Sequence, residues 1–165
     1  MSIIEELNEQ YERYDAALTL QHNLLTKSLG GLSVGLGSYL GLTKAHWNDK
    51  EGKRGDRYVR LGVGAPNVFE EKMWPQLPST GGVVEFSLAV TLECETATYQ
   101  RYTFVFEGRL QFSSGGYEYR FQGIDSPIVI SAAEVEADDF TSVYRALVDK
   151  LKKAFDPASI VIVRG

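Results

Sequence analysis

Three consecutive segments within residues 83–122 alternate between apolar and polar side chains, and this alternation constrains the fold more than any other feature of the chain. The apolar positions are Val84, Phe86, Leu88, Val90, Leu92, Cys94, Tyr102, Phe104, Phe106, Leu110, Phe112, Tyr117, Tyr119 and Phe121. Side chains two residues apart point to the same face of a strand. The pattern therefore predicts an antiparallel meander with one apolar and one polar face.

On the polar face of this meander, we expect the carboxylates of the first strand to pair with arginines of the second. The carboxylates of the first strand are Glu85, Glu93 and Glu95, and the arginines of the second are Arg101 and Arg109. A further carboxylate, Glu107, belongs to the same face. A glycosidase would need two carboxylates at a defined separation beside a cleft. A polar sheet face rich in Glu and Arg is the more ordinary interpretation.

Residues 3–29 are predicted to form one long helix. Ser2 and Glu5 have the spacing of a capping box, and Gly30 and Gly31 are typical of a left-handed helix stop. An apolar stripe with spacings of three and four runs along it through Ile4, Leu7, Tyr11, Tyr14, Leu18 and Leu25, with Gln21 in the gap.

Such a helix is about 40 Å long, whereas a strand of five or six residues spans only about 17–20 Å. The helix can therefore overhang the sheet that it covers. Two interpretations of the stripe stay open: it lies diagonally across a large sheet, or it pairs with a partner such as a second copy of the chain.

The rest of the chain completes a single α+β domain over residues 1–165. Further strands are expected at residues 32–42, 57–63 and 127–130, with residues 160–163 as a final strand or a docked tail. We expect residues 32–42 and 57–63 to form a hairpin around a polar loop, 44–56. A C-terminal helix is predicted over 139–155, preceded by the capping pair Asp138 and Asp139. The fold class is α+β, with a mainly antiparallel sheet of about six or seven strands and both helices packed on one face.

Several kinds of chemistry are disfavoured by the residues present. The G-x-S-x-G match at Gly31–Gly35 would place Ser33 in a strand and not at a strand-to-helix turn, so it does not predict a nucleophile. His22, His46 and Cys94 are too few for a typical zinc site. We therefore expect no enzyme activity, no cofactor and no metal. A single cysteine, no secretory leader and no apolar run long enough for a bilayer predict a cytoplasmic protein without membrane contact.

The least ordinary surface feature is residues 44–60. Six basic residues and three acidic ones give this segment a charge of +3, whereas the whole chain has −5 and the remainder therefore −8. A cationic loop that carries an aromatic residue can be an ordinary solvated loop whose Trp47 folds onto the sheet. It can also dock on an acidic protein, or grip phosphates and stack on a base. The acidic remainder favours a protein partner over nucleic acid. The candidate partner-binding residues are His46, Trp47, Lys53, Arg54 and Arg57.

Our leading hypothesis is a non-enzymatic binding or accessory protein that acts through protein–protein contacts, as a homodimer or with another protein. The long N-terminal helix and the basic 44–60 segment would supply the contacts. One alternative is a small-molecule-binding domain whose cavity is lined by aromatic side chains, namely Phe104, Phe106, Phe112, Tyr117, Tyr119 and Phe121. The other alternative is nucleic-acid binding through the basic segment.

Overall fold

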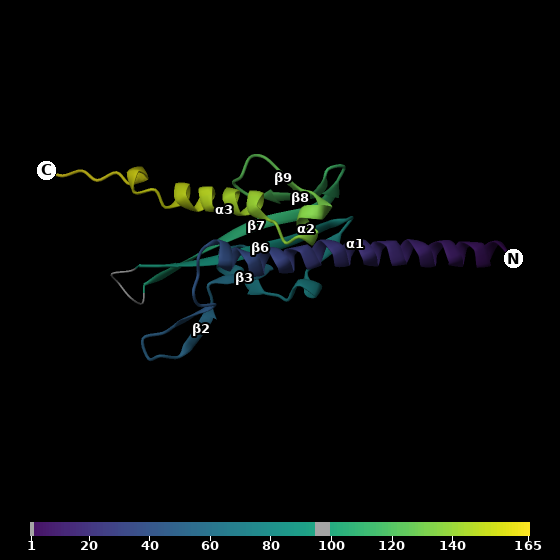
Figure 1. The fold of residues 1–165 in the computed structure, drawn as a ribbon, viewed down its shortest axis with the longest axis horizontal. Helices are drawn as coiled ribbons and strands as arrows, with labels where there is room; N and C mark the ends of the chain where they lie inside the picture. Colours follow the sequence, from purple (N-terminus) through teal and green to yellow (C-terminus); the bar gives the residue numbers. More distant parts are fainter. Residues whose placement is uncertain (1, 95–99) are drawn as a thin grey trace.

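A seven-stranded antiparallel sheet forms the centre of the computed structural model, which describes residues 2–94 and 100–165 (Figure 1). Its strands are β3 (Val59–Val63), β4 (Glu70–Glu71), β5 (Ser79–Thr80), β6 (Val83–Glu93), β7 (Arg101–Ser113), β8 (Gly116–Phe121) and β9 (Ile128–Ile130). The strand order is β4-β3-β6-β7-β8-β9, and β5 pairs with β6. The α-helices are α1 (Ile3–Tyr39), α2 (Ala132–Glu136) and α3 (Thr141–Ala154). Short 3-10 turns lie at Pro66–Val68, Trp74–Gln76 and Pro157–Ser159. The predicted fold class is confirmed.

The meander of β6, β7 and β8 follows the alternation in the sequence. Leu88 lies opposite Phe106 on the apolar face, and both are buried. On the polar face, cross-strand ion pairs form as expected, between residues directly opposite each other. Their nitrogen–oxygen distances are 3.1 Å for Arg101–Glu93 and 3.5 Å for Arg109–Glu85. Period-two patterning therefore predicts the buried apolar residues at the centre of the meander. The other face is not exposed along its whole length, because Ser87, Ala89 and Thr91 of β6 are also buried. Toward the strand ends, several members of the apolar set are exposed, namely Leu92, Cys94, Tyr102 and Phe112. Glu95 lies outside the described residues.

The N-terminal helix is longer than predicted, and the strand expected at residues 32–42 does not form. α1 continues through both glycines to Tyr39 and is 37 residues long. Leu32 and Leu36 are buried, as a strand with period two would also require, but Val34 between them is 76% exposed. Leu25, Leu29, Leu32 and Leu36 instead continue the helical spacing of the stripe. The strand prediction was wrong because Leu32 and Leu36 fit both the period of two of a strand and the spacing of a helix.

The glycines of α1 allow neighbouring aromatic side chains to approach the helix closely. A Cβ atom on Gly30 would lie 2.6 Å from the Trp74 ring, and one on Gly35 would lie 2.4 Å from the Tyr144 hydroxyl. Both distances are too short for any side chain, so these positions serve packing and do not terminate the helix. A left-handed glycine does follow the end of α1, but it is Gly41, with φ of 77°.

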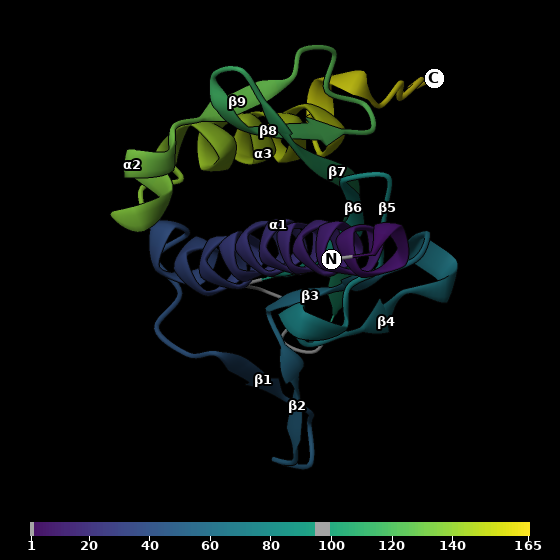
Figure 2. The ribbon, with the colours of Figure 1, turned by 90° about the vertical axis from the view of Figure 1, so that its right-hand side faces the viewer.

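The apolar face of the sheet is covered by the second half of α1 and by α3 (Figures 1 and 2). α3 contributes Val143, Leu147 and Leu151 to the same core cluster as the leucines of α1. The Tyr144 hydroxyl donates a 2.9 Å hydrogen bond to the Leu32 carbonyl oxygen, which ties the two helices together. α3 begins at Thr141, two residues later than predicted, and Asp139 accepts hydrogen bonds from the Thr141 amide and hydroxyl.

Several connections also differ from the expected ones. Residues 44–56 are not a plain loop, because β1 (His46–Asn48) and β2 (Arg54–Arg57) form a separate two-stranded hairpin. β3 consequently pairs with β6 and β4 and not with residues 32–42. α2 was missed, although Ser131 and Glu134 form a capping box at its start. Residues 160–163 form neither a strand nor a docked tail: all four side chains are strongly exposed.

Two buried tyrosines make the fold sensitive to alkaline pH. Burial raises the pKa of Tyr119 and of Tyr144 above the usual value for tyrosine. In the unfolded chain both ionise near about pH 10. Their burial as neutral groups therefore stabilises the fold fully below that pH, and this contribution is lost as pH rises toward their folded pKa values.

We accordingly expect the free energy of unfolding in urea to decline above about pH 10. Tyr144→Phe should be less stable than the unchanged chain at neutral pH, because it loses the hydrogen bond to Leu32. Its alkaline decline should be shallower, since one ionising group has been removed. Equal slopes above that pH would contradict the assignment of the decline to buried tyrosines.

Candidate functional site

The first half of α1 projects from the rest of the molecule (Figure 1). All residues from 3 to 20, called the free half below, are exposed. At 1.5 Å per residue this segment extends for about 27 Å. The overhang considered as one option from the sequence is therefore confirmed, and the sheet covers α1 only from about residue 21 onward.

The free half carries an uninterrupted row of exposed apolar side chains. We call this row the apolar stripe; it consists of Ile4, Leu7, Tyr11, Tyr14 and Leu18. Their exposed fractions range from 43% for Leu18 to 68% for Tyr11. Tyr11 and Tyr14 lie near the middle of the free half. In the covered half of α1, residues at the same spacing form the core. The helix face that packs on the sheet in the covered half is therefore the face that is exposed in the free half.

Local interactions favour a helix in the free half even without tertiary contacts. Ser2 and Glu5 form the predicted capping box, in which the Ser2 amide donates a 2.8 Å hydrogen bond to the Glu5 carboxylate. Residues 3–20 contain no glycine or proline. Five acidic residues and one arginine give this segment a charge of −4. Two of the acidic residues, Glu5 and Glu6, lie in the first turn, where they complement the helix dipole.

The second surface is the basic hairpin, formed by β1 and β2 within the basic segment 44–60, and it extends away from the sheet below α1 (Figure 2). It is held to the strand pair β6–β7 by Arg101. The guanidinium of Arg101 lies 4.1 Å from the centroid of the Trp47 ring, and it also donates a hydrogen bond to the Asn48 carbonyl oxygen. Arg101 is paired with Glu93 in turn, and Glu93 accepts a hydrogen bond from the Tyr58 hydroxyl.

This network was not predicted from the sequence. Burial, and then the hydrogen bond to Glu93, raise the pKa of Tyr58. The ion pair of Arg101 with Glu93 was expected, but nothing in the local sequence relates Arg101 to Trp47, which is 54 positions earlier. The network fixes the base of the hairpin to the sheet and thereby determines where its basic side chains lie.

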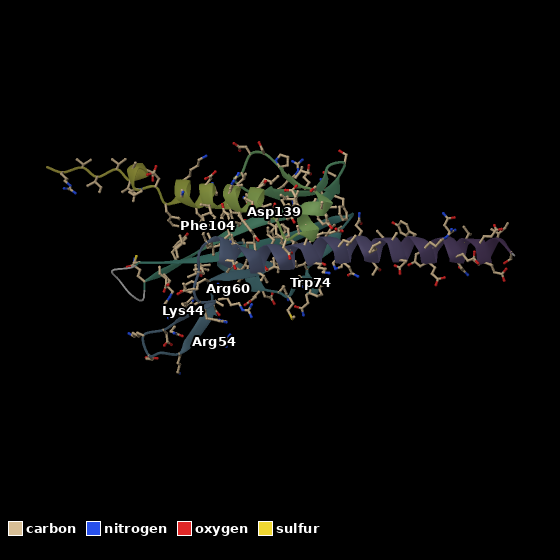
Figure 3. All side chains as sticks on the ribbon, in the orientation of Figure 1. Lys44, Arg54, Arg60, Trp74, Phe104 and Asp139 are labelled. Carbon is tan, nitrogen blue, oxygen red and sulfur yellow. The ribbon has the colours of Figure 1, made fainter. Side chains whose placement is uncertain are left out.

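The structure brings all five predicted partner-binding residues together on this hairpin. Lys53, Arg54 and Arg57 are exposed, whereas His46 and Trp47 are half-buried. Figure 3 labels Arg54 on this hairpin. His46 contacts the Arg54 side chain, and its Nδ1 atom lies 3.3 Å from the Gly55 carbonyl oxygen. Trp47 covers Gly55 and Arg101. The exposed cations are therefore the residues most accessible to a partner, and Trp47 has a structural contact of its own.

Two hollows on the surface are further candidates. A groove of about 1270 Å³ crosses α1 and is lined by residues such as Gly30, Val34, Met73, Trp74 and Phe140. A smaller hollow of about 650 Å³ lies on the polar side of the meander, where Glu85, Glu107, Arg109 and Arg120 contribute to its lining. Arg109 is paired with Glu85, and Arg120 with Glu118 at 3.2 Å.

Other sequence features take ordinary structural places. Ser33 is helical, and its hydroxyl donates to the Gly30 carbonyl oxygen. Within residues 2–94 and 100–165, no three His, Cys, Asp or Glu side chains gather as metal ligands would. None of the helices in that part of the chain combines the length and apolar character needed to cross a bilayer. Phe106, Tyr117, Tyr119 and Phe121 of the aromatic set belong to the packed core.

The fold and its surfaces thus define an α+β domain with a projecting N-terminal helix and a basic hairpin. Comparison of the chain with protein-family models, with curated proteins and with solved structures finds no match in any of the three.

Proposed function

We propose that the chain is a non-enzymatic binding or accessory protein that acts through protein–protein contacts on the free half of α1. The apolar stripe is the observation that carries this proposal. A continuous exposed apolar patch is typical of interaction sites. Residues spaced three and four apart on one helix face are also the pattern by which helices dock into grooves or pair with other helices.

The basic hairpin supplies a second contact surface in this proposal. Lys53, Arg54 and Arg57 are exposed on one short hairpin, whose base is held by Arg101. An acidic protein surface fits this charge. Electrostatic contacts of exposed residues contribute mainly to association rate and specificity, so we assign the larger share of affinity to the stripe. We also place the protein in the cytoplasm, because its one cysteine, Cys94, is an exposed thiol that cannot form an internal disulfide.

Retention of proteins on the immobilised full-length chain tests the proposal. The proteins offered are a differently tagged copy of the chain and an extract of its own cells. Leu7→Glu should abolish retention of the partner, since it puts a carboxylate within the apolar stripe. Leu20→Glu is the matched control: it makes the same change at a leucine that is 60% exposed on the same helix but off the stripe. If the Leu7→Glu and Leu20→Glu variants retain the same proteins, the stripe has no role in binding.

A charge variant separates the contribution of the hairpin in the same experiment. Lys53→Gln with Arg54→Gln removes two exposed cations and should leave the free energy of unfolding within about 0.5 kcal/mol. Retention should fall partially, and the loss should be largest at low salt, because exposed charges are screened within about 10 Å at 0.1 M salt. If the only species lost is RNA or DNA, the hairpin is instead a nucleic-acid contact.

A further inference from the structure

We propose that the partner on the apolar stripe is a second copy of the chain, and that two copies pair through the free halves of their α1 helices in antiparallel orientation. The inference rests on the proposed function, because it names the partner of the same surface. Three properties of the described residues support it: the space around the stripe, the residues that pairing brings together, and the placement of the charges.

The space around the stripe admits an antiparallel helix but not a parallel one. The stripe continues into the buried face of α1, where Leu25 and Leu29 contact the chain's own sheet. The boundary lies near Gln21, since a Cβ atom on Gly82, in the turn before β6, would be only 3.2 Å from the Gln21 side-chain nitrogen. His22 is held to the neighbouring β5 residue Ser79 at 2.7 Å.

A parallel partner would have to continue past this boundary into the volume of the sheet. An antiparallel partner leaves in the opposite direction, past the first turn of α1, which projects away from the folded body (Figure 1). In that arrangement the two folded bodies lie at opposite ends of the pair. The N-terminal tip of each helix ends beside the other copy's turn before β6.

Antiparallel pairing also matches the stripe with itself. The seam has two alternating sets of positions, because its steps are alternately three and four residues long. In an antiparallel helix pair, a position of one set faces a position of the other set on the second helix. Leu7 then faces Leu18 of the second copy, and Tyr11 faces Tyr14. Ile4 reaches Gln21, the one polar residue on the seam, at the edge of the sheet. Each of the inner layers is thus leucine on leucine or tyrosine on tyrosine.

The acidic residues of the free half do not oppose this pairing. Four of the five lie on the faces directed away from the seam: Glu5, Glu6, Glu9 and Glu12. The fifth, Asp15, flanks the seam and faces Asn8 of the second copy. The other flank of the seam carries Ile3, Gln10, Ala17 and Leu24. No two like charges are therefore brought opposite each other, which would disfavour association.

The area that pairing would bury is close to that of the smallest stable interfaces. Full burial of an aromatic side chain removes about 150–250 Å² from water. Tyr11 and Tyr14 are 68% and 61% exposed, so the four tyrosines of a pair would bury on the order of 400–650 Å². The six aliphatic side chains of the two stripes and the contacts at both tips add to this area. The interface thus approaches the lower limit of about 1,200 Å² for stable complexes.

Sedimentation of the full-length protein over a wide concentration series tests whether the copies pair. We expect a monomer–dimer equilibrium for the unchanged chain. Leu7→Glu should weaken dimerisation at least about tenfold, since each dimer contains two Leu7–Leu18 layers. Leu20→Glu should dimerise as the unchanged chain does. A monomer at every concentration, or equal dimerisation of the two variants, would overturn the proposal.

Disulfide trapping tests the orientation. Cys94 is first replaced by serine, so that the introduced thiols are the only ones. When Leu7→Cys and Leu18→Cys proteins are mixed and oxidised, the mixed disulfide should form faster than either homodimeric disulfide. Faster crosslinking of Leu7→Cys with itself would show parallel pairing and would overturn the antiparallel arrangement.

These experiments separate the failure of this inference from that of the proposed function. If the chain is monomeric but another protein binds Leu20→Glu and not Leu7→Glu, the second copy is ruled out and the stripe remains a protein-binding surface. If neither a second copy nor another protein distinguishes the two variants, both proposals fail.

Discussion

Replacing Leu32 with alanine is expected to lower the free energy of unfolding by about 2–5 kcal/mol. Leu32 is fully buried among the core leucines of α1. The substitution deletes buried methyl groups, so the fold loses the stabilisation from their burial, and it leaves a cavity in the core. Both effects destabilise the fold. Urea denaturation followed by circular dichroism measures the change.

Val34→Ala is the matched control and discriminates between helix and strand. Val34 is 76% exposed on the helix, so its loss should change the free energy of unfolding by no more than about 0.5 kcal/mol. A small gain would be consistent with the better helix propensity of alanine. In a strand with period two, Leu32 and Val34 would share the buried face, and both substitutions would be costly. Two large losses would therefore contradict the continuation of α1 through this segment.

Two glycines in the same turns of α1 are expected to respond to alanine with opposite signs. A Cβ atom on Gly35 would lie 2.4 Å from the Tyr144 hydroxyl, which must then leave its hydrogen bond to Leu32. Gly35→Ala should lower the free energy of unfolding by about 1–3 kcal/mol, because overpacking outweighs the gain of about 1 kcal/mol in helix propensity. At Gly37 the nearest atom to such a Cβ is Leu42 Cδ1 at 3.8 Å, an ordinary contact. Gly37→Ala should therefore stabilise the fold by up to about 1 kcal/mol.

A double variant identifies the cause of the Gly35 effect. Tyr144→Phe removes the hydroxyl that the new methyl group meets. Combined with Gly35→Ala, it should cost less than the sum of the two single changes, because the residues are in contact. Additive losses would mean that the hydroxyl of Tyr144 is not the group that excludes a side chain at position 35.

The sequence predicts the fold correctly where its apolar residues fit only one periodicity, either that of a strand or that of a helix. Alternation in residues 83–122 has no helical interpretation, and it predicts the meander with its cross-strand ion pairs. The segment after Gly30 satisfies two periods at once. Its glycines are read as a stop when only the backbone is considered. At Gly30 and Gly35 the structure gives a different reason, which is the close approach of Trp74 and Tyr144 from distant parts of the chain.

Some features of the candidate surfaces follow from the local sequence and could be predicted, whereas others depend on the tertiary fold and could not. The spacing of Ile4, Leu7 and Tyr11 predicts an apolar stripe, and helix length predicts an overhang. The residue at which the sheet begins to cover α1 depends on the position of the turn before β6, which only the fold supplies. The charge of the basic hairpin is additive and can be counted. The contact between Trp47 and Arg101 depends on tertiary geometry, so its role in fixing the hairpin was not foreseen.

The uneven cover of α1 divides one continuous helix into two regions that should open by different routes. The covered half contains four glycines and is helical because the leucines pack on the sheet. Its amide protons should therefore exchange with solvent mainly when the whole domain unfolds. The free half has good helix formers and a capped tip, but its side chains are all exposed within the described part of the chain. In an isolated copy its amides should exchange rapidly by fraying from the tip, and slow exchange there would report an occupied stripe.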